Sequence, residues 1–382
     1  RPFFRTAINH RDAMGNNIDH DIVELRGSSI SYFTGKMENY FRLKGIPYLL
    51  ESMVFPGEVE RNKKVLGISQ MPTVQLPDGR WMTDSTKMIE WFEGEYPDNP
   101  IVPSDPVQAF VCFLLEDWAD EWWWRPAMHY RWFYEEGARF ASGHLAREVM
   151  GGLHLPLFVK RAMLRRRQRN GYTRGDGIGP EAVAGVEADV SALFSQLEII
   201  FSKRPFLLGD RPTLADIGFS GPFFRHFALD PIPLQLLRHT APNTLEWVMR
   251  LWNSSPASAV GSLVDGVPDD IRALLTHTAR GYLPYLNANV DAVRRGDSRF
   301  TAAFDGVTYQ GARSSQYRVW CLDELRRHYR ELEQSDSAKL EPLLRETGVW
   351  GPLWAADDLP LLKDQESRLP FWGDSKMTKV HE

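Results

Sequence analysis

Ser31 and Tyr32 open the segment SYFTGK, which joins a strand-like run at residues 22–26 to a stretch with helical spacing. A helix N-terminus presents unpaired N–H groups and a partial positive charge, so it stabilises an anion. A hydroxyl there donates a further hydrogen bond to a thiolate. The two effects, roughly 1.5 to 3 and 0.3 to 1 kcal/mol, lower the pKa of a bound thiol by about one to three units. The segment therefore predicts a site that makes a thiol nucleophilic; the alternative for Ser31 is a plain helix cap.

Met71 and Pro72 form an X-Pro bond at the head of a predicted strand, MPTVQL. If this bond is cis, the residue before proline turns its backbone N–H and C=O outward, where a peptide-like ligand pairs with them as an extra strand. The alternative is an ordinary trans bond. Asp84 and Ser85 stand at the N-cap and first turn of the next predicted helix, where a ligand carboxylate meets free N–H groups and a hydroxyl. Plain capping is again the alternative, and both roles are compatible.

The first hundred residues predict a small α/β domain. Strand-like runs IVELR, IPYLLESMVF, MPTVQL and RWMT combine with helical stretches KMENYFRLKG and DSTKMIEWFEGEYP, and a linker with a possible helix separates the second and third strands. Gly45 stands where the first helix should end. This order predicts a four-stranded sheet with helices on both faces. PDNPIVPSDP, with four prolines, predicts a linker to the next domain.

The remainder of the chain predicts mostly helices. Helical spacing covers 107–135, 141–168, 180–203, 213–227 and 243–253. Beyond GVPDD, two more helical stretches flank FTAAFDGVTYQG, which resembles a strand or hairpin. We expect an N-terminal arm at 1–20, an α/β domain at 21–98, a linker at 99–105, an all-α domain at 106–262 and a C-terminal extension at 263–382, whose last dozen residues form a frayed tail.

Three motifs in the α/β part, taken in order, resemble the N-terminal domain of the glutathione transferase superfamily. They are SYFTGKMENYFRLKGIPY, QMPTVQLPDG and TDSTKMIEWFE. In the helical part, RPFLLGDRPTLADIGFSGP contains a predicted capping box, Thr213 with Asp216, and resembles the helix-start motif of the family's C-terminal domain. The resemblance covers about residues 22–255 and implies a thioredoxin-like α/β domain followed by an all-α helical bundle.

The resemblance also implies roles for residues, with glutathione as co-substrate. It assigns the thiol to Ser31, the backbone clamp to Met71 with Pro72, and the γ-glutamyl group to Asp84 with Ser85. Two positions depart from the family. Tyr32 stands where many members have proline and is expected to present a second hydroxyl near the sulfur, and Asp84 replaces the commoner glutamate. KMENYF also resembles metaxin-like branches, some of which are not known as catalysts.

The segment EDWADEWWWRPAMHYRWFYEE gathers five tryptophans with acids and bases. In the family the corresponding helix lines the cleft for the second substrate. The candidate pocket residues are Asp120, Arg125, His129 and Tyr130. The alternative, which we prefer for most of the segment, is a core helix that packs its aromatic rings against its neighbours. Pro126 predicts a kink in this helix.

Composition argues against several classes of partner and site. The net charge of −5 and the pI near 6.1 give no reason to expect nucleic acid. Cys112 and Cys321 are far apart and suggest neither a disulfide framework nor a zinc site, so we expect a reducing cytoplasm and no metal. The sequence contains no run of about 18 apolar residues, so we expect no membrane span. The seven basic residues in 160–174 suggest a phosphate, nucleic-acid or acidic-lipid contact, or a solvated helix end, which we prefer.

The sequence thus predicts a glutathione-dependent transferase or lyase that acts on a small hydrophobic electrophile. The alternative is a non-catalytic binding or scaffold protein that uses the extension to hold a partner. A third possibility is that the extension covers the cleft as a lid and restricts substrates. Homodimerisation is expected from the resemblance alone. We assign no role to His226, His239, His277 and His328.

Overall fold

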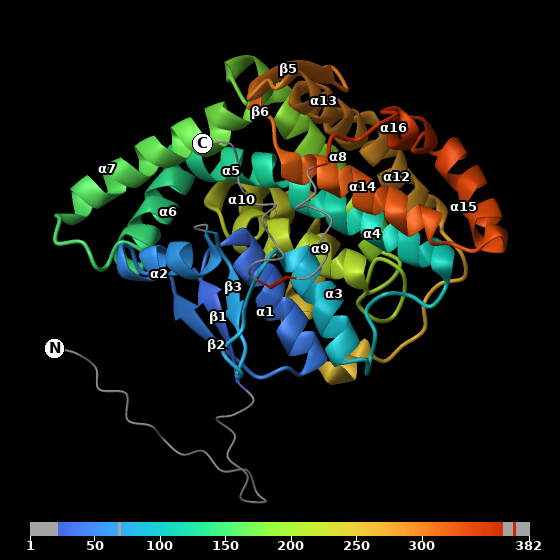
Figure 1. The fold of residues 1–382 in the computed structure, drawn as a ribbon, viewed down its shortest axis with the longest axis horizontal. Coiled ribbons are helices and arrows are strands. Elements are labelled where there is room, and N and C mark those ends of the chain that lie inside the picture. Colours follow the sequence, from blue (N-terminus) through green and yellow to red (C-terminus); the bar gives the residue numbers. More distant parts are fainter. Residues whose placement is uncertain (1–21, 68–69, 362–369, 372–382) are drawn as a thin grey trace, which may run out of the picture.

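A four-stranded sheet forms the base of the N-terminal domain (Figure 1). The structure, a computed structural model, describes residues 22–67, 70–361 and 370–371, so the predicted arm and tail lie outside the described residues. Strands β1 (Val23–Gly27) and β2 (Tyr48–Ser52) are parallel, and β3 (Thr73–Gln75) and β4 (Trp81–Thr83) continue the sheet antiparallel, in the order β2-β1-β3-β4.

Three helices complete this domain: α1 (Tyr32–Lys44), α2 (Gly57–Leu66) and α3 (Ser85–Glu95). The possible helix between the second and third strands is therefore a real one. Gly45 ends α1 in the left-handed conformation, with φ 70°, as predicted. In Figure 1, α1 and α3 lie between the sheet and the helical part of the molecule, and α1 packs on α9.

The helical domain contains more breaks than the periodicity predicted. Helix α4 (Pro106–Glu121) ends before α5 (Trp124–Phe133), so the predicted helix 107–135 is two helices, with the break two residues ahead of Pro126. The predicted helix 141–168 is also two. The helices from here to residue 252 are α6 (Glu135–Glu148), α7 (Leu157–Gln168), α8 (Val183–Phe201), α9 (Leu214–Pro222), α10 (Pro231–Thr240) and α11 (Pro242–Trp252).

The predicted capping box at the start of α9 is confirmed. Thr213 and Asp216 exchange the two expected hydrogen bonds. The buried Asp216 carboxylate also accepts from the backbone N–H of Leu207 and from the Trp247 indole, both at 3.0 Å. These bonds join the preceding loop and α11 to the start of α9.

The C-terminal extension folds onto the helical domain. The predicted hairpin is present, with a turn at Asp305 and Gly306 whose φ angles, 46° and 79°, suit a tight two-residue loop. Its elements are α12 (Asp269–Arg280), α13 (Tyr282–Arg295), β5 (Arg299–Phe304), β6 (Val307–Arg313), α14 (Gln316–Arg330), α15 (Gln334–Glu346) and α16 (Trp350–Trp354). Helix α14 lies along α4 (Figure 1).

One continuous apolar core joins the sheet, the helical domain and the extension. It includes Leu25 of β1, Leu115 of α4 and Leu322 of α14, all fully buried. The extension is therefore part of the folded body, and its removal would expose core surface. Across the part of the chain that the structure describes, no helix is long and apolar enough to cross a membrane.

Candidate functional site

Ser31 lies at the junction between β1 and α1. It occupies the N-cap of α1 with extended backbone angles, is partly exposed, and its side chain makes no capping hydrogen bond. The plain-cap alternative therefore does not describe its hydroxyl. The backbone N–H of Ser31 donates to the Ser28 carbonyl at 3.0 Å, which closes the turn before the helix.

The helical domain holds this turn from two sides. Glu148 of α6 accepts from the Ser29 backbone N–H at 2.8 Å and from the Ser28 hydroxyl at 3.0 Å. Arg131 of α5 donates to the Ile30 carbonyl at 2.7 Å and pairs with the buried Asp230 at 2.9 Å. Because these partners are themselves fixed by ion pairs and helices, the junction beside Ser31 is preorganised.

The prediction for Tyr32 is corrected. Its side chain is fully buried, and its hydroxyl donates to the Ala119 carbonyl at 2.5 Å. Burial raises the pKa of this hydroxyl well above its usual range. Tyr32 therefore ties α1 to α4 and does not face a bound sulfur.

Asp120 is likewise not an electrophile-pocket residue. The ammonium group of Lys36, fully buried in α1, pairs with Asp120 and, at 2.5 Å, with Glu116 of α4. The Thr86 hydroxyl donates to Glu116 at 2.8 Å. Two carboxylates around one ammonium raise the pKa of Lys36, against the effect of burial, so this lysine stays charged. The cluster is a buried ionic contact between the two domains.

Arg125, His129 and Tyr130 also lie in packing contacts and do not form one pocket with Asp120. The Arg125 guanidinium is buried against the rings of Trp122, Tyr285 and Tyr309, at 4.4, 4.0 and 4.6 Å from their centroids. His129 contacts Glu187 of α8 at 2.9 Å, and burial lowers its pKa. The preferred alternative, a core helix, is the better description.

Asp84 stands at the N-cap of α3, as predicted, and accepts from the Lys87 backbone N–H. It is 6% exposed, and burial raises its pKa. Its Oδ1 also accepts from the hydroxyl of Tyr317 of α14, at 3.2 Å. Its Oδ2 is buried with no hydrogen-bond partner among the described residues. A buried unpartnered carboxylate oxygen is costly, and a cationic ligand group fits it.

The extension covers this corner from a second direction. The Thr83 backbone N–H donates to the Pro370 carbonyl at 3.0 Å, and Met82 pairs with Phe371 as an antiparallel bridge along β4. Ser85, next to Asp84, is only 8% exposed. The corner that holds Asp84 and Ser85 is therefore enclosed by the N-terminal domain, α14 and residues 370–371.

The Met71–Pro72 peptide bond is cis, as predicted. The β1–β3 ladder begins at Thr73, opposite Arg26, so Met71 lies beyond the paired part of the strand. A second cis bond, Phe55–Pro56, was not predicted. Thr73 pairs with Arg26 near the end of β1 and with Thr83 at the end of β4, so Met71 and the N-termini of α1 and α3 all follow from the same end of the sheet.

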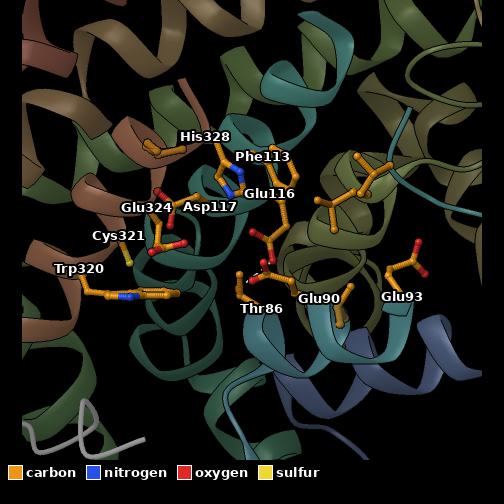
Figure 2. Close-up of a pocket in the computed structure, with 14 residues that line it drawn as sticks. Thr86, Glu90, Glu93, Phe113, Glu116, Asp117, Trp320, Cys321, Glu324 and His328 are labelled. Atoms are coloured by element: carbon orange, nitrogen blue, oxygen red, sulfur yellow. Dashed lines mark hydrogen bonds between the residues drawn. The ribbon is translucent and has the colours of Figure 1, made fainter. Parts of the chain in front are cut away.

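A cavity of about 110 Å³ opens between α3, α4 and α14 (Figure 2). Figure 2 shows Asp117 beside Cys321 and Glu324, with Glu116 and Thr86 across from them. The cavity is too small for a drug-sized or tripeptide ligand. Burial raises the pKa of Asp117 to about 8, while the hydroxyl of Tyr282 donates to its carboxyl at 2.6 Å. Both cysteines of the chain are free and buried.

A second cavity, of about 580 Å³, lies between α8, α12 and the β5–β6 hairpin. Its wall includes His277, which contacts Asp189 at 2.5 Å. His226 lies 3.5 Å from Asp230, four residues later, so two histidines with no role assigned from the sequence have acidic partners in the structure. Within the described residues, no group of three His, Cys, Asp or Glu side chains is placed to hold a metal.

The sheet order, the cis bond and the capped helices together define a thioredoxin-like domain joined to an all-α domain. Residues 25–100 match the family "Glutathione S-transferase, N-terminal domain", and residues 164–255 match "Glutathione S-transferase, C-terminal domain". Two parts of the chain, in this order, thus match the two domains of the glutathione S-transferase superfamily.

Relatives and solved structures resemble parts of the chain. Glutathione S-transferases U4 and U6 of Arabidopsis thaliana are each 29% identical, over 103 and 113 residues, which are 26% and 28% of this chain. The matches span 44% and 47% of those relatives, less than half of their length. A glutathione S-transferase of Methylobacterium radiotolerans in complex with glutathione sulfonate matches at 18% identity and a TM-score of 0.37, over 65% of this chain and all of that one. The β-etherase LigF of Sphingobium matches at 21% identity and a TM-score of 0.44, over 62% of this chain and 96% of that one.

Proposed function

We propose that this protein is a glutathione-dependent transferase or lyase that acts on a small hydrophobic electrophile, with the Ser31 hydroxyl stabilising the glutathione thiolate. The observation that carries the proposal is the position of Ser31. It caps α1 by its backbone only, so both its hydroxyl and the N-terminus of the helix remain available to an anion.

The other end of glutathione fits the corner at Asp84. The γ-glutamyl group carries an α-ammonium, and Asp84 Oδ2 is a buried carboxylate oxygen that lacks a partner among the described residues. The α-carboxylate of the same group would meet the first N–H groups of α3 and Ser85. The backbone of Met71, beside its cis bond, is the proposed clamp for the cysteinyl part.

The chemistry begins with loss of the thiol proton. The thiolate then forms a carbon–sulfur bond with the electrophile, and the displaced group leaves with the electron pair of its former bond. Conjugation and reductive ether cleavage share this first step, as does isomerisation, in which glutathione is released again. The proposed Ser31 contribution is one charge-assisted hydrogen bond, roughly 1.5 to 3 kcal/mol, or about one to two pKa units of the bound thiol.

Titration of the thiolate absorbance of bound glutathione tests the proposal. We expect a pKa well below 8.5 for the intact chain and a rise of about one to two units for Ser31→Ala. Ser335→Ala, at an exposed serine of α15, is the matched control and should leave the pKa unchanged. A bound thiol that ionises within about half a unit of free glutathione would remove the catalytic interpretation. Ser31→Cys should add mixed-disulfide reductase activity.

The second candidate function is a non-catalytic binding or scaffold protein. It is favoured by the cover that Tyr317 and residues 370–371 place over Asp84 and Ser85. The same cover is compatible with a lid that restricts substrates. Calorimetric titration with glutathione separates these functions: no binding supports the scaffold, whereas binding with a lowered thiol pKa supports the enzyme.

A homodimer in the cytoplasm completes the proposal, on the resemblance to the family. Light scattering during size-exclusion chromatography measures the assembly: a mass near 88 kDa, twice the 43.8 kDa of the chain, is expected.

A further inference from the structure

Helix α7 lies in a basic segment of the chain. Between residues 149 and 175 there are seven lysines and arginines and no aspartate or glutamate, although the whole chain has a net charge of −5. In Figure 1, α7 lies at the edge of the molecule, beyond α6. The helix attaches to α6 through the buried Leu164, which packs with Ala146 and Met150. Its opposite face meets solvent.

Large apolar side chains lie on that solvent face. Phe158 is 75% exposed and Met163 47%, and Leu155, two residues before the helix begins, is 42% exposed. Phe158 and Ala162 precede Arg166 at intervals of four residues, and Met163 precedes Arg167 by four, so two neighbouring rows form a stripe that combines apolar and basic side chains. Exposed Leu157 adjoins it. Apolar side chains gathered in this way on a helix mark an interaction surface.

The cations of the stripe are not neutralised by the protein. Arg165 and Arg169 pair with Glu135 of α6, at 2.8 and 3.6 Å. The side chains of Arg166 and Arg167 have no hydrogen-bond or ion-pair partner in the described part of the chain, and both residues are exposed. The surface therefore combines unpaired positive charge with unburied apolar area over a helix about 18 Å long.

We propose that the outer face of α7, from Leu155 to Arg167, docks on a membrane surface that contains acidic lipids. Phe158 and Met163 would enter the boundary between head groups and acyl chains, while Arg166 and Arg167 meet the lipid phosphates and carboxylates. A nucleic acid offers the same anionic charge but nothing comparable in which to bury these apolar side chains. A second copy would bring two basic faces together, which repel.

Vesicle co-sedimentation of the full chain tests this surface. Vesicles of phosphatidylcholine alone are compared with vesicles of equal parts phosphatidylcholine and phosphatidylserine. We expect binding to the acidic vesicles only, weakened by salt. Arg166→Ser with Arg167→Ser should weaken it about thirtyfold, and Phe158→Ser about tenfold or more. Arg294→Ser with Arg295→Ser, two exposed arginines at the end of α13, is the matched control and should leave binding unchanged.

Three results would overturn the proposal. The first is no binding to either vesicle, or binding that the Phe158 and the Arg166 with Arg167 variants leave unchanged. The second is retention of a DNA duplex that requires Arg166 and Arg167 while vesicles are not bound. The third is a dimer, measured by light scattering without lipid, that Phe158→Ser dissociates. Circular dichroism melting of each variant shows whether it is folded. Phe158→Ser removes apolar burial and the double arginine variant removes charge, so if one variant fails to fold, the other still tests the surface.

Discussion

The Tyr317 hydroxyl of α14 lies 3.2 Å from Oδ1 of Asp84, so a side chain of the C-terminal extension contacts the residue proposed to bind the γ-glutamyl group. The two residues are 233 positions apart. Lys87, fully buried in the first turns of α3, lies beneath the Trp320 ring of the same helix α14, at 5.1 Å from its centroid. The extension is thus placed to affect how the N-terminal domain receives its ligand.

Replacement of Tyr317 by Phe is expected to weaken glutathione binding. The hydroxyl lowers the pKa of Asp84, which burial raises, so its loss favours the protonated carboxyl. We expect an increase of about tenfold in KM for glutathione with a nearly unchanged kcat, and an acid limb of kcat/KM that moves to higher pH. Tyr329→Phe, on the same helix but away from Asp84, is the control. An unchanged KM would show that Tyr317 has no part in binding.

Asp84→Asn separates the charge of Asp84 from its cap. Asparagine still caps α3, because its side-chain oxygen accepts from the Lys87 N–H, but it offers no charge to the ligand ammonium. We expect glutathione affinity to fall about tenfold to a hundredfold, with a melting temperature close to that of the parent. Asp105→Asn is the matched control, since Asp105 caps α4 and accepts from the Gln108 N–H at 2.8 Å. Equal loss of affinity in both variants would contradict a direct role for Asp84.

Local chemistry allowed much of the fold to be predicted. The turn into α1, the glycine that ends it and the capping box at Thr213 each depend on residues within a few positions of one another. The two-residue hairpin at Asp305 is of the same kind. Such features follow from backbone preference and short-range hydrogen bonds, which the sequence displays directly.

The residues proposed for the electrophile pocket could not be placed from local sequence. Asp120 and Tyr32 were both expected at the cleft, but which side of α4 faces α1 is decided by packing between domains. That packing pairs Asp120 with Lys36 and places the Tyr32 hydroxyl against the Ala119 carbonyl. Tyr317 was missed because no residue near it marks a contact 233 positions away. In the sequence, the acidic residues within the otherwise apolar α4 indicate that a buried cation must pair with them.

Lys36→Met tests the ionic cluster between the domains. The variant leaves the carboxylates of Glu116 and Asp120 buried without their cation, which costs about 3 to 5 kcal/mol of the free energy of unfolding. Urea denaturation followed by circular dichroism measures the loss. Lys339→Met removes an exposed ion pair with Asp336 and should leave the free energy of unfolding nearly unchanged. Adding Glu116→Gln and Asp120→Asn to Lys36→Met should recover part of the loss; no recovery would contradict an electrostatic origin.

Asp117 is expected to make stability depend on pH. Burial raises its pKa to about 8 in the folded chain, whereas the unfolded side chain titrates near 3.9, so the folded state holds the extra proton between these values. The contribution of this neutral carboxyl is complete below about pH 4 and is lost as the pH rises through 8. Asp117→Asn keeps an acceptor for the Tyr282 hydroxyl and cannot ionise. Melting temperatures from pH 6 to 9 should therefore fall more steeply for the parent than for this variant, and parallel curves would show that Asp117 does not carry the proton.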